Sequence, residues 1–80
     1  MNAKVYLLID IVNNDCGPVI QSLRRQPGVV SVDWLEGKPN IIVSLQANDR
    51  DTLAQLMMTV LESIDGVTED LKLLIPKGVR

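Results

Sequence analysis

Four side chains are the candidates for acid–base or nucleophilic chemistry: Tyr6, Asp10, Cys16 and Asp33. Asp10 stands out because it is an acid inside an otherwise apolar run, where burial can tune a carboxyl for proton transfer. An active site needs a second polar group that works with the first, and no spacing in the sequence assigns one. We therefore expect no enzymatic activity and no catalytic residue. The alternative role for Asp10 is that of a residue at a strand end, on the rim of a sheet.

Metal and cofactor binding are also not expected from the residue types present. The chain has one cysteine, Cys16, and no histidine. A soft-metal site needs several thiolate or imidazole ligands, so one thiolate cannot close it. A single cysteine cannot form a disulfide within the chain, and unpaired thiols are typical of a reducing cytoplasm.

Charge and hydropathy argue against two classes of partner. Eight basic and ten acidic residues give a net charge of −2, and the only adjacent basic residues are Arg24 and Arg25. Binding to phosphates needs clustered Lys and Arg, so we expect no direct contact with nucleic acid. No apolar stretch approaches the roughly 20 residues of a membrane-spanning helix, and the first residues lack a signal-peptide cleavage region. The expected protein is soluble and cytoplasmic.

Six segments would position these side chains. Runs of β-branched and aliphatic residues predict strands over residues 4–12, 29–36, 41–47 and 67–75. A first helix begins near Pro18, with Asp15 or Gly17 as its cap, and ends before Gly28, for which we expect a positive φ. Residues 37–40 form the turn of a hairpin between the second and third strands.

The strongest helical pattern follows residues 48–51, where Asn48 or Asp49 can serve as the cap. Six apolar residues recur at helical spacing and form one continuous stripe: Leu53, Leu56, Met57, Val60, Leu61 and Ile64. A Gly-Val pair follows each helix, at residues 28–29 and 66–67. The order β-α-β-β-α-β predicts one domain over residues 1–80 with an α+β, ferredoxin-like sandwich fold, in which two helices cover one face of a four-stranded antiparallel sheet.

Both faces of this sheet carry apolar residues. If the odd-numbered residues of the first strand face the helices, Tyr6 and Leu8 face the other way. The hairpin adds Trp34 or Leu35 to that face, whichever register holds. The open face of a two-layer sandwich is normally polar, and a core this small usually needs a partner. We therefore expect a dimer that covers this face, although scattered exposed apolar residues are also ordinary.

Four segments at a joint spacing carry a family resemblance: Pro27-Gly28-Val29, Gly37-Lys38-Pro39-Asn40, Asn48-Asp49-Arg50-Asp51 and Ile64-Asp65-Gly66-Val67. In this arrangement the chain resembles, over nearly its whole length, the effector-binding domain of the Lrp/AsnC regulators, also called the regulation-of-amino-acid-metabolism (RAM) domain. The resemblance implies a module that dimerises through its open sheet faces into an α/β-barrel-like assembly, or a ring of dimers. It also implies a small effector, usually an amino acid, at subunit interfaces.

Full-length members of that family carry a helix-turn-helix that binds DNA, and the sequence shows no such segment. We therefore expect a stand-alone domain that binds an effector or associates with a full-length regulator. The alternative is a degenerate heavy-metal-associated domain, or another ferredoxin-like interaction module, without a ligand. Heavy-metal-associated domains place a CxxC motif before the first helix; Cys16 matches its first cysteine, and Val19 replaces the second.

The turn over residues 37–40 departs from the family pattern of glycine, any residue, an aromatic and aspartate. Gly37 matches, but Pro39 replaces the aromatic and Asn40 the aspartate. Asn40 keeps an acceptor without the charge, so a zwitterion should bind more weakly there. In the last strand, Thr68 fits the threonines that the family presents to its effector, and Asp70 stands where a smaller neutral residue is common. These five residues are the candidate ligand-binding positions; the alternative explanations are a plain turn and a solvated strand face.

Overall fold

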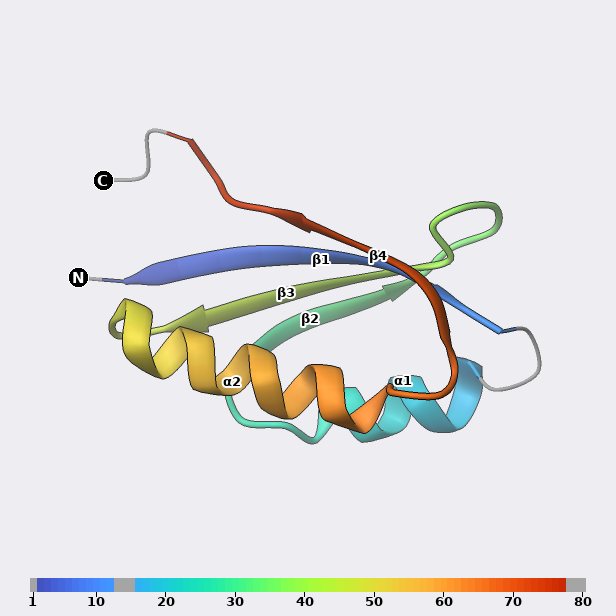
Figure 1. Cartoon of the computed structure of the whole chain (residues 1–80), viewed down its shortest axis with the longest axis horizontal. Helices are drawn as coiled ribbons and strands as arrows, with labels where there is room; N and C mark the ends of the chain where they lie inside the picture. Colours follow the sequence, from blue (N-terminus) through green and yellow to red (C-terminus); the bar gives the residue numbers. More distant parts are fainter. Residues whose placement is uncertain (1, 13–15, 78–80) are drawn as a thin grey trace.

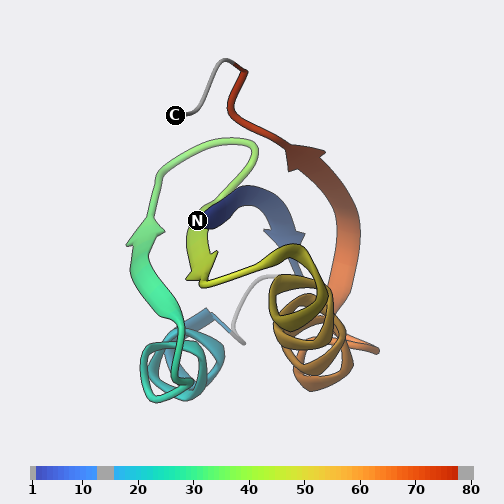
Figure 2. The same ribbon diagram turned by 90° about the vertical axis from the view of Figure 1, so that its left-hand side faces the viewer.

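The computed structural model describes residues 2–12 and 16–77, and it confirms the predicted order of elements (Figure 1). The elements are β1 (Ala3–Ile11), α1 (Cys16–Arg24), β2 (Val29–Trp34), β3 (Ile41–Ala47), α2 (Arg50–Ser63) and β4 (Thr68–Leu74). The strands form one antiparallel sheet in the order β2-β3-β1-β4. Both helices lie on the same side of it, as Figure 2 shows. The ferredoxin-like fold is therefore confirmed.

The core lies between the sheet and the helices. Buried residues of β1 and β3 pair in register and face the helices: Val5 with Leu45, Leu7 with Val43, and Ile9 with Ile41. The apolar stripe predicted for α2 is confirmed, since Leu53, Val60 and Ile64 are buried and the other three members pack against the core. Alternation along β1 leaves Tyr6 and Leu8 on the opposite face, which we call the open face.

Local chemistry sets the ends of the helices. The Asp49 carboxylate accepts a hydrogen bond of 2.7 Å from the backbone N–H of Thr52 and so caps α2. This bond lowers the pKa of Asp49 from its ordinary value of 3.8. Gly28 has the predicted positive φ, +92°, and a Cβ there would lie 2.5 Å from Cδ2 of Leu56. Asp15, one predicted cap of α1, lies outside the described residues.

The edge strand β4 is less covered than the other strands. α1 packs on β2, whereas α2 packs on β3 and β1. Leu73 pairs with the fully buried Leu7 and therefore faces the helix side of the sheet, yet it is 47% exposed. The open side of β4 carries Leu74, which is also exposed. β4 therefore presents apolar side chains on both faces.

Candidate ligand-binding site

A hollow of about 520 Å³ opens on the open face, where β1 and β4 run beneath the β2–β3 loop. Its lining residues come from three segments: Leu8 and Asp10 of β1, Lys38 and Pro39 of the loop, and Glu69, Asp70 and Lys72 of β4. The register pairs Leu8 with Lys72 and Asp10 with Asp70 across the two strands. The volume is within the roughly 300–1,000 Å³ typical of small-molecule sites. Three carboxyl groups and two ammonium groups therefore surround the apolar side chains of Leu8 and Pro39.

An irregularity in β4 adds Glu69 to this lining. The pairing passes from Asp10–Asp70 directly to Ile11–Thr68, so Glu69 is an extra residue with no register partner on β1. In a regular strand it would point to the face opposite Asp70, because side chains alternate. A β-bulge redirects side chains in this way and is common next to binding sites.

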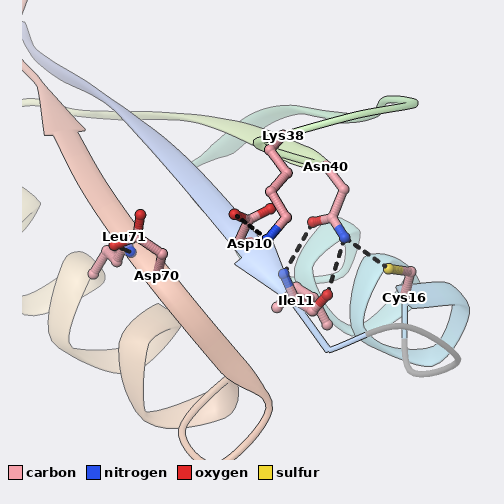
Figure 3. A network of polar contacts seen from close by, with 7 residues as sticks. All are labelled: Asp10, Ile11, Cys16, Lys38, Asn40, Asp70 and Leu71. Carbon is pink, nitrogen blue, oxygen red and sulfur yellow. Dashed lines mark hydrogen bonds and ion pairs between the residues drawn. The ribbon is translucent and has the colours of Figure 1, made fainter.

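Asp10 is the most buried polar residue of the hollow. It is only 8% exposed, and its Oδ1 atom is buried with no hydrogen-bond partner among the described residues. Its Oδ2 atom lies 3.9 Å from Nζ of Lys38, whose side chain is 78% exposed (Figure 3). Pairs with such an exposed lysine contribute about 0–1 kcal/mol, whereas an unpaired buried carboxylate oxygen is costly. Asp10 is therefore a buried acceptor that a cationic donor would satisfy.

Asn40 anchors the loop that covers this hollow. Its Oδ1 atom accepts a hydrogen bond of 2.9 Å from the backbone N–H of Ile11, and its Nδ2 atom donates one of 3.0 Å to the Ile11 carbonyl (Figure 3). Nδ2 also donates to Sγ of Cys16 at 3.7 Å. The side-chain amide thus binds the end of β1 as another strand would, and it holds Lys38 and Pro39 beside Asp10. Its hydrogen-bonding groups are directed at the backbone of Ile11 and the thiol of Cys16.

The five predicted ligand-binding residues fall into three groups. Pro39 and Asp70 line the 520 Å³ hollow. Gly37 and Asn40 line a second hollow of about 300 Å³, which shares Asp10 with the first. Thr68 lines neither of them, and its hydroxyl donates a hydrogen bond of 2.8 Å to a backbone carbonyl at the end of α2.

Four lining residues were not assigned to a site from the sequence: Asp10, Lys38, Glu69 and Lys72. Lys72 alternates with Asp70 along β4, so the sequence already places the two on one face of the sheet. Lys38 belongs to the turn over residues 37–40, in which the sequence indicates Gly37, Pro39 and Asn40 as candidates. No sequence pattern indicates the bulge at Glu69. Asp10 drew attention as an acid in an apolar strand, and the structure surrounds it with these groups.

The predicted dimer contacts lie on different sides of the sheet. Two of them, Tyr6 and Leu8, lie on the open face beside Ile42 and Leu74, and we call these four residues the open-face patch. Trp34 is in register with Ile41 and therefore lies on the helix side, where it is 60% exposed. Leu35 follows the end of β2 and is 38% exposed. The apolar surface of the open face thus comes from β1, β3 and β4, without Trp34.

The described residues lack two further features. No three Asp, Glu, Cys or His side chains in this part of the chain are arranged to hold a metal ion. Neither α1 nor α2 is long and apolar enough to cross a membrane.

Comparisons with known proteins identify relatives by structure. No protein-family model matches the sequence, and no curated protein matches it significantly. PH0061 has a TM-score of 0.83 and 27% sequence identity over 99% of this chain. FFRP-DM1 has a TM-score of 0.80 at 15% identity over 92% of this chain, and MtbAldR has 0.75 at 17% over 98%. The chain spans 97% of FFRP-DM1 but only 54% of PH0061 and of MtbAldR.

All three structures are Lrp/AsnC family proteins. At their lower identities, FFRP-DM1 and MtbAldR support the fold, while PH0061 adds similarity in sequence over nearly the whole chain. The resemblance predicted from the four sequence segments is confirmed. The chain has the ferredoxin-like fold of the Lrp/AsnC effector-binding domain and resembles that regulator family.

Proposed function

We propose that the chain is a non-enzymatic effector-binding and assembly module of the Lrp/AsnC type. It binds a small amino-acid-like ligand in the 520 Å³ hollow and associates with other subunits through its open face. The observation that carries this proposal is the combination of charged groups of both signs around one hollow. Such a module acts in the cytoplasm, in agreement with its single unpaired cysteine.

The lining of the hollow suits a zwitterion. Asp10 and Asp70 offer carboxylates to an ammonium group, and Lys72 offers an ammonium group to a carboxylate. Hydrogen bonds between charged groups are roughly twice as strong as neutral ones, so both ends of the ligand would contribute. Leu8 supplies an apolar surface for the rest of the ligand.

The open-face patch supports association with a second copy of the chain or with a full-length regulator that has the same face. Leu8 belongs to both the patch and the lining of the hollow. A subunit that covers the patch would therefore also restrict the hollow, which couples ligand binding to assembly. Any ligand that binds only the assembled form stabilises that form by mass action.

Thermal unfolding against a panel of amino acids at millimolar concentration tests ligand binding. A ligand at ten times its dissociation constant stabilises a protein by about 1.4 kcal/mol. In a domain of this size, that raises the unfolding midpoint by roughly 6–11 °C. We expect one or a few amino acids to raise it selectively. A panel without any shift would contradict ligand binding and favour an interaction module without a ligand.

The variant Leu8→Asp tests assembly. It places a charge in the open-face patch, where covering it would cost several kcal/mol, so we expect a lower mass by sedimentation equilibrium. Met58→Asp is the matched control, because Met58 is 62% exposed on α2. Assembly through the open face is wrong if the wild type is a monomer at all concentrations, or if folded Leu8→Asp retains the wild-type mass.

A further inference from the structure

We infer that the hollow selects a basic amino acid such as L-lysine. In this inference, Asp10 binds the ammonium group of the ligand's side chain. This inference rests on the proposed function, because it names the class of effector that the same hollow takes. A general amino-acid site needs one carboxylate for an ammonium group and one cation for a carboxylate. This hollow has Asp10, Glu69 and Asp70 against Lys38 and Lys72, which leaves one carboxylate in excess.

The buried oxygen of Asp10 indicates where a cation would bind. Oδ1 is buried and lacks a partner among the described residues, and the whole residue is 8% exposed. Asp70 lies directly opposite on β4, and its Oδ1 atom accepts a hydrogen bond from its own neighbour, the N–H of Leu71, at 2.9 Å. Two carboxylates opposite each other on neighbouring strands are unfavourable without a cation between them. A ligand ammonium between the two carboxylates would give Oδ1 of Asp10 a partner and would reduce the repulsion between Asp10 and Asp70.

Lys38 takes the place of such a cation in the structure. Its Nζ atom lies 3.9 Å from Oδ2 of Asp10, which is longer than a hydrogen bond, and its side chain is 78% exposed. The backbone of the loop is anchored separately through Asn40 and Ile11. The lysine side chain can therefore leave without moving the loop, and a ligand ammonium can replace it.

The spacing of charges along the strands favours a ligand with separated charges. Lys72 is paired with Leu8, and Asp10 is paired with Asp70, two residues further along each strand. The Leu8–Lys72 pair and the Asp10–Asp70 pair are therefore roughly 7 Å apart along the strands. In a neutral amino acid the ammonium and carboxylate groups share one carbon atom, whereas the methylene chain of lysine separates its carboxylate from its terminal ammonium. The carboxylate of lysine can thus bind Lys72 while its terminal ammonium binds Asp10.

Isothermal titration calorimetry on the whole chain, with L-lysine and L-norleucine as ligands, tests this inference. Norleucine has an unbranched chain like that of lysine but lacks the terminal ammonium. We expect lysine to bind about 10- to 100-fold more tightly, as for a hydrogen bond between charged groups. Asp10→Asn should reduce this preference to within a few-fold, and Asp33→Asn, at an exposed position on β2, should leave it unchanged.

The outcomes separate the inference from the proposed function. Equal binding of lysine and norleucine to the wild type would overturn the inference and leave the proposed function standing. If neither they nor any other amino acid binds, the proposed function fails and the inference fails with it. If Asp10→Asn does not fold, Lys38→Met provides a second test. It removes the competing ammonium, so lysine should bind about 2- to 5-fold more tightly; unchanged or weaker binding would contradict the role of Lys38.

Discussion

Asn40→Asp is the substitution that best tests how the candidate site is built, because it would restore the aspartate of the family pattern. In the structure, Asn40 both accepts from the N–H of Ile11 at 2.9 Å and donates to the Ile11 carbonyl at 3.0 Å. An ionised carboxylate can accept but cannot donate. The substitution therefore leaves the Ile11 carbonyl without its partner and places a negatively charged oxygen beside it.

The expected loss is about 2 kcal/mol, the middle of the range for a partly buried polar group that loses its partner. This corresponds to a fall of roughly 8–16 °C in the unfolding midpoint at neutral pH. Protonation of the introduced carboxyl restores the donor, so the Ile11 carbonyl raises its pKa in the folded state. The stabilisation by the protonated carboxyl is fully present below the unfolded pKa of about 3.9, and it is lost as the pH rises through the raised pKa of the folded state. The loss of stability of Asn40→Asp relative to the wild type, which we call the deficit, should therefore be smaller in acid.

Thermal unfolding of Asn40→Asp and the wild type between pH 3 and pH 7 measures this deficit directly. Asn48→Asp is the matched control, since it makes the same chemical change at an exposed residue before α2. The hydrogen-bonding role of Asn40 is refuted if its substitution is neutral at pH 7, or if the deficit is the same at every pH.

Two further substitutions test the helix ends. Gly28→Ala should lower stability by roughly 1–3 kcal/mol, because it puts a side chain at φ +92° and against Leu56; Gly17→Ala, where nothing lies within 4 Å of the added Cβ, is the control that should be neutral or stabilising. Asp49→Ala should lower the unfolding midpoint at pH 7 by removing the cap on Thr52. Because the pKa of Asp49 is lowered from 3.8, the capping contribution is present above that value and is lost in acid, so the difference from the wild type should vanish at low pH.

The elements of the fold could be predicted because their signals are local. The helical stripe of α2, the bounds of β3 and the positive φ of Gly28 each follow from a few neighbouring residues. β2 ends two residues earlier than predicted, at Trp34, and the backbone N–H of Leu35 donates a hydrogen bond to the carbonyl of Asn40 across the base of the loop. Strand alternation likewise predicted that Tyr6 and Leu8 share the face opposite the core.

The candidate site depends on pairings that no local pattern contains. The position of Asp10 opposite Asp70 depends on the register between β1 and β4, and the inclusion of Glu69 depends on a bulge within that register. The side of the sheet on which Trp34 lies was open in the sequence, because a shift of one residue exchanges the two faces. Its pairing with Ile41 decides the question.

The sequence by itself thus determined which segments become strands and helices, because spacing along the chain decides which side chains share a face. Only the tertiary structure decided what Asn40 does. Its partner Ile11 is 29 residues away, and an amide in a turn has the same local propensity whether it meets a ligand or a strand end. The same holds for Asp10: its apolar neighbours in sequence predicted burial, but its charged neighbours in space come from the loop and from β4. A site formed by residues of different strands can be identified only when the register between those strands is known.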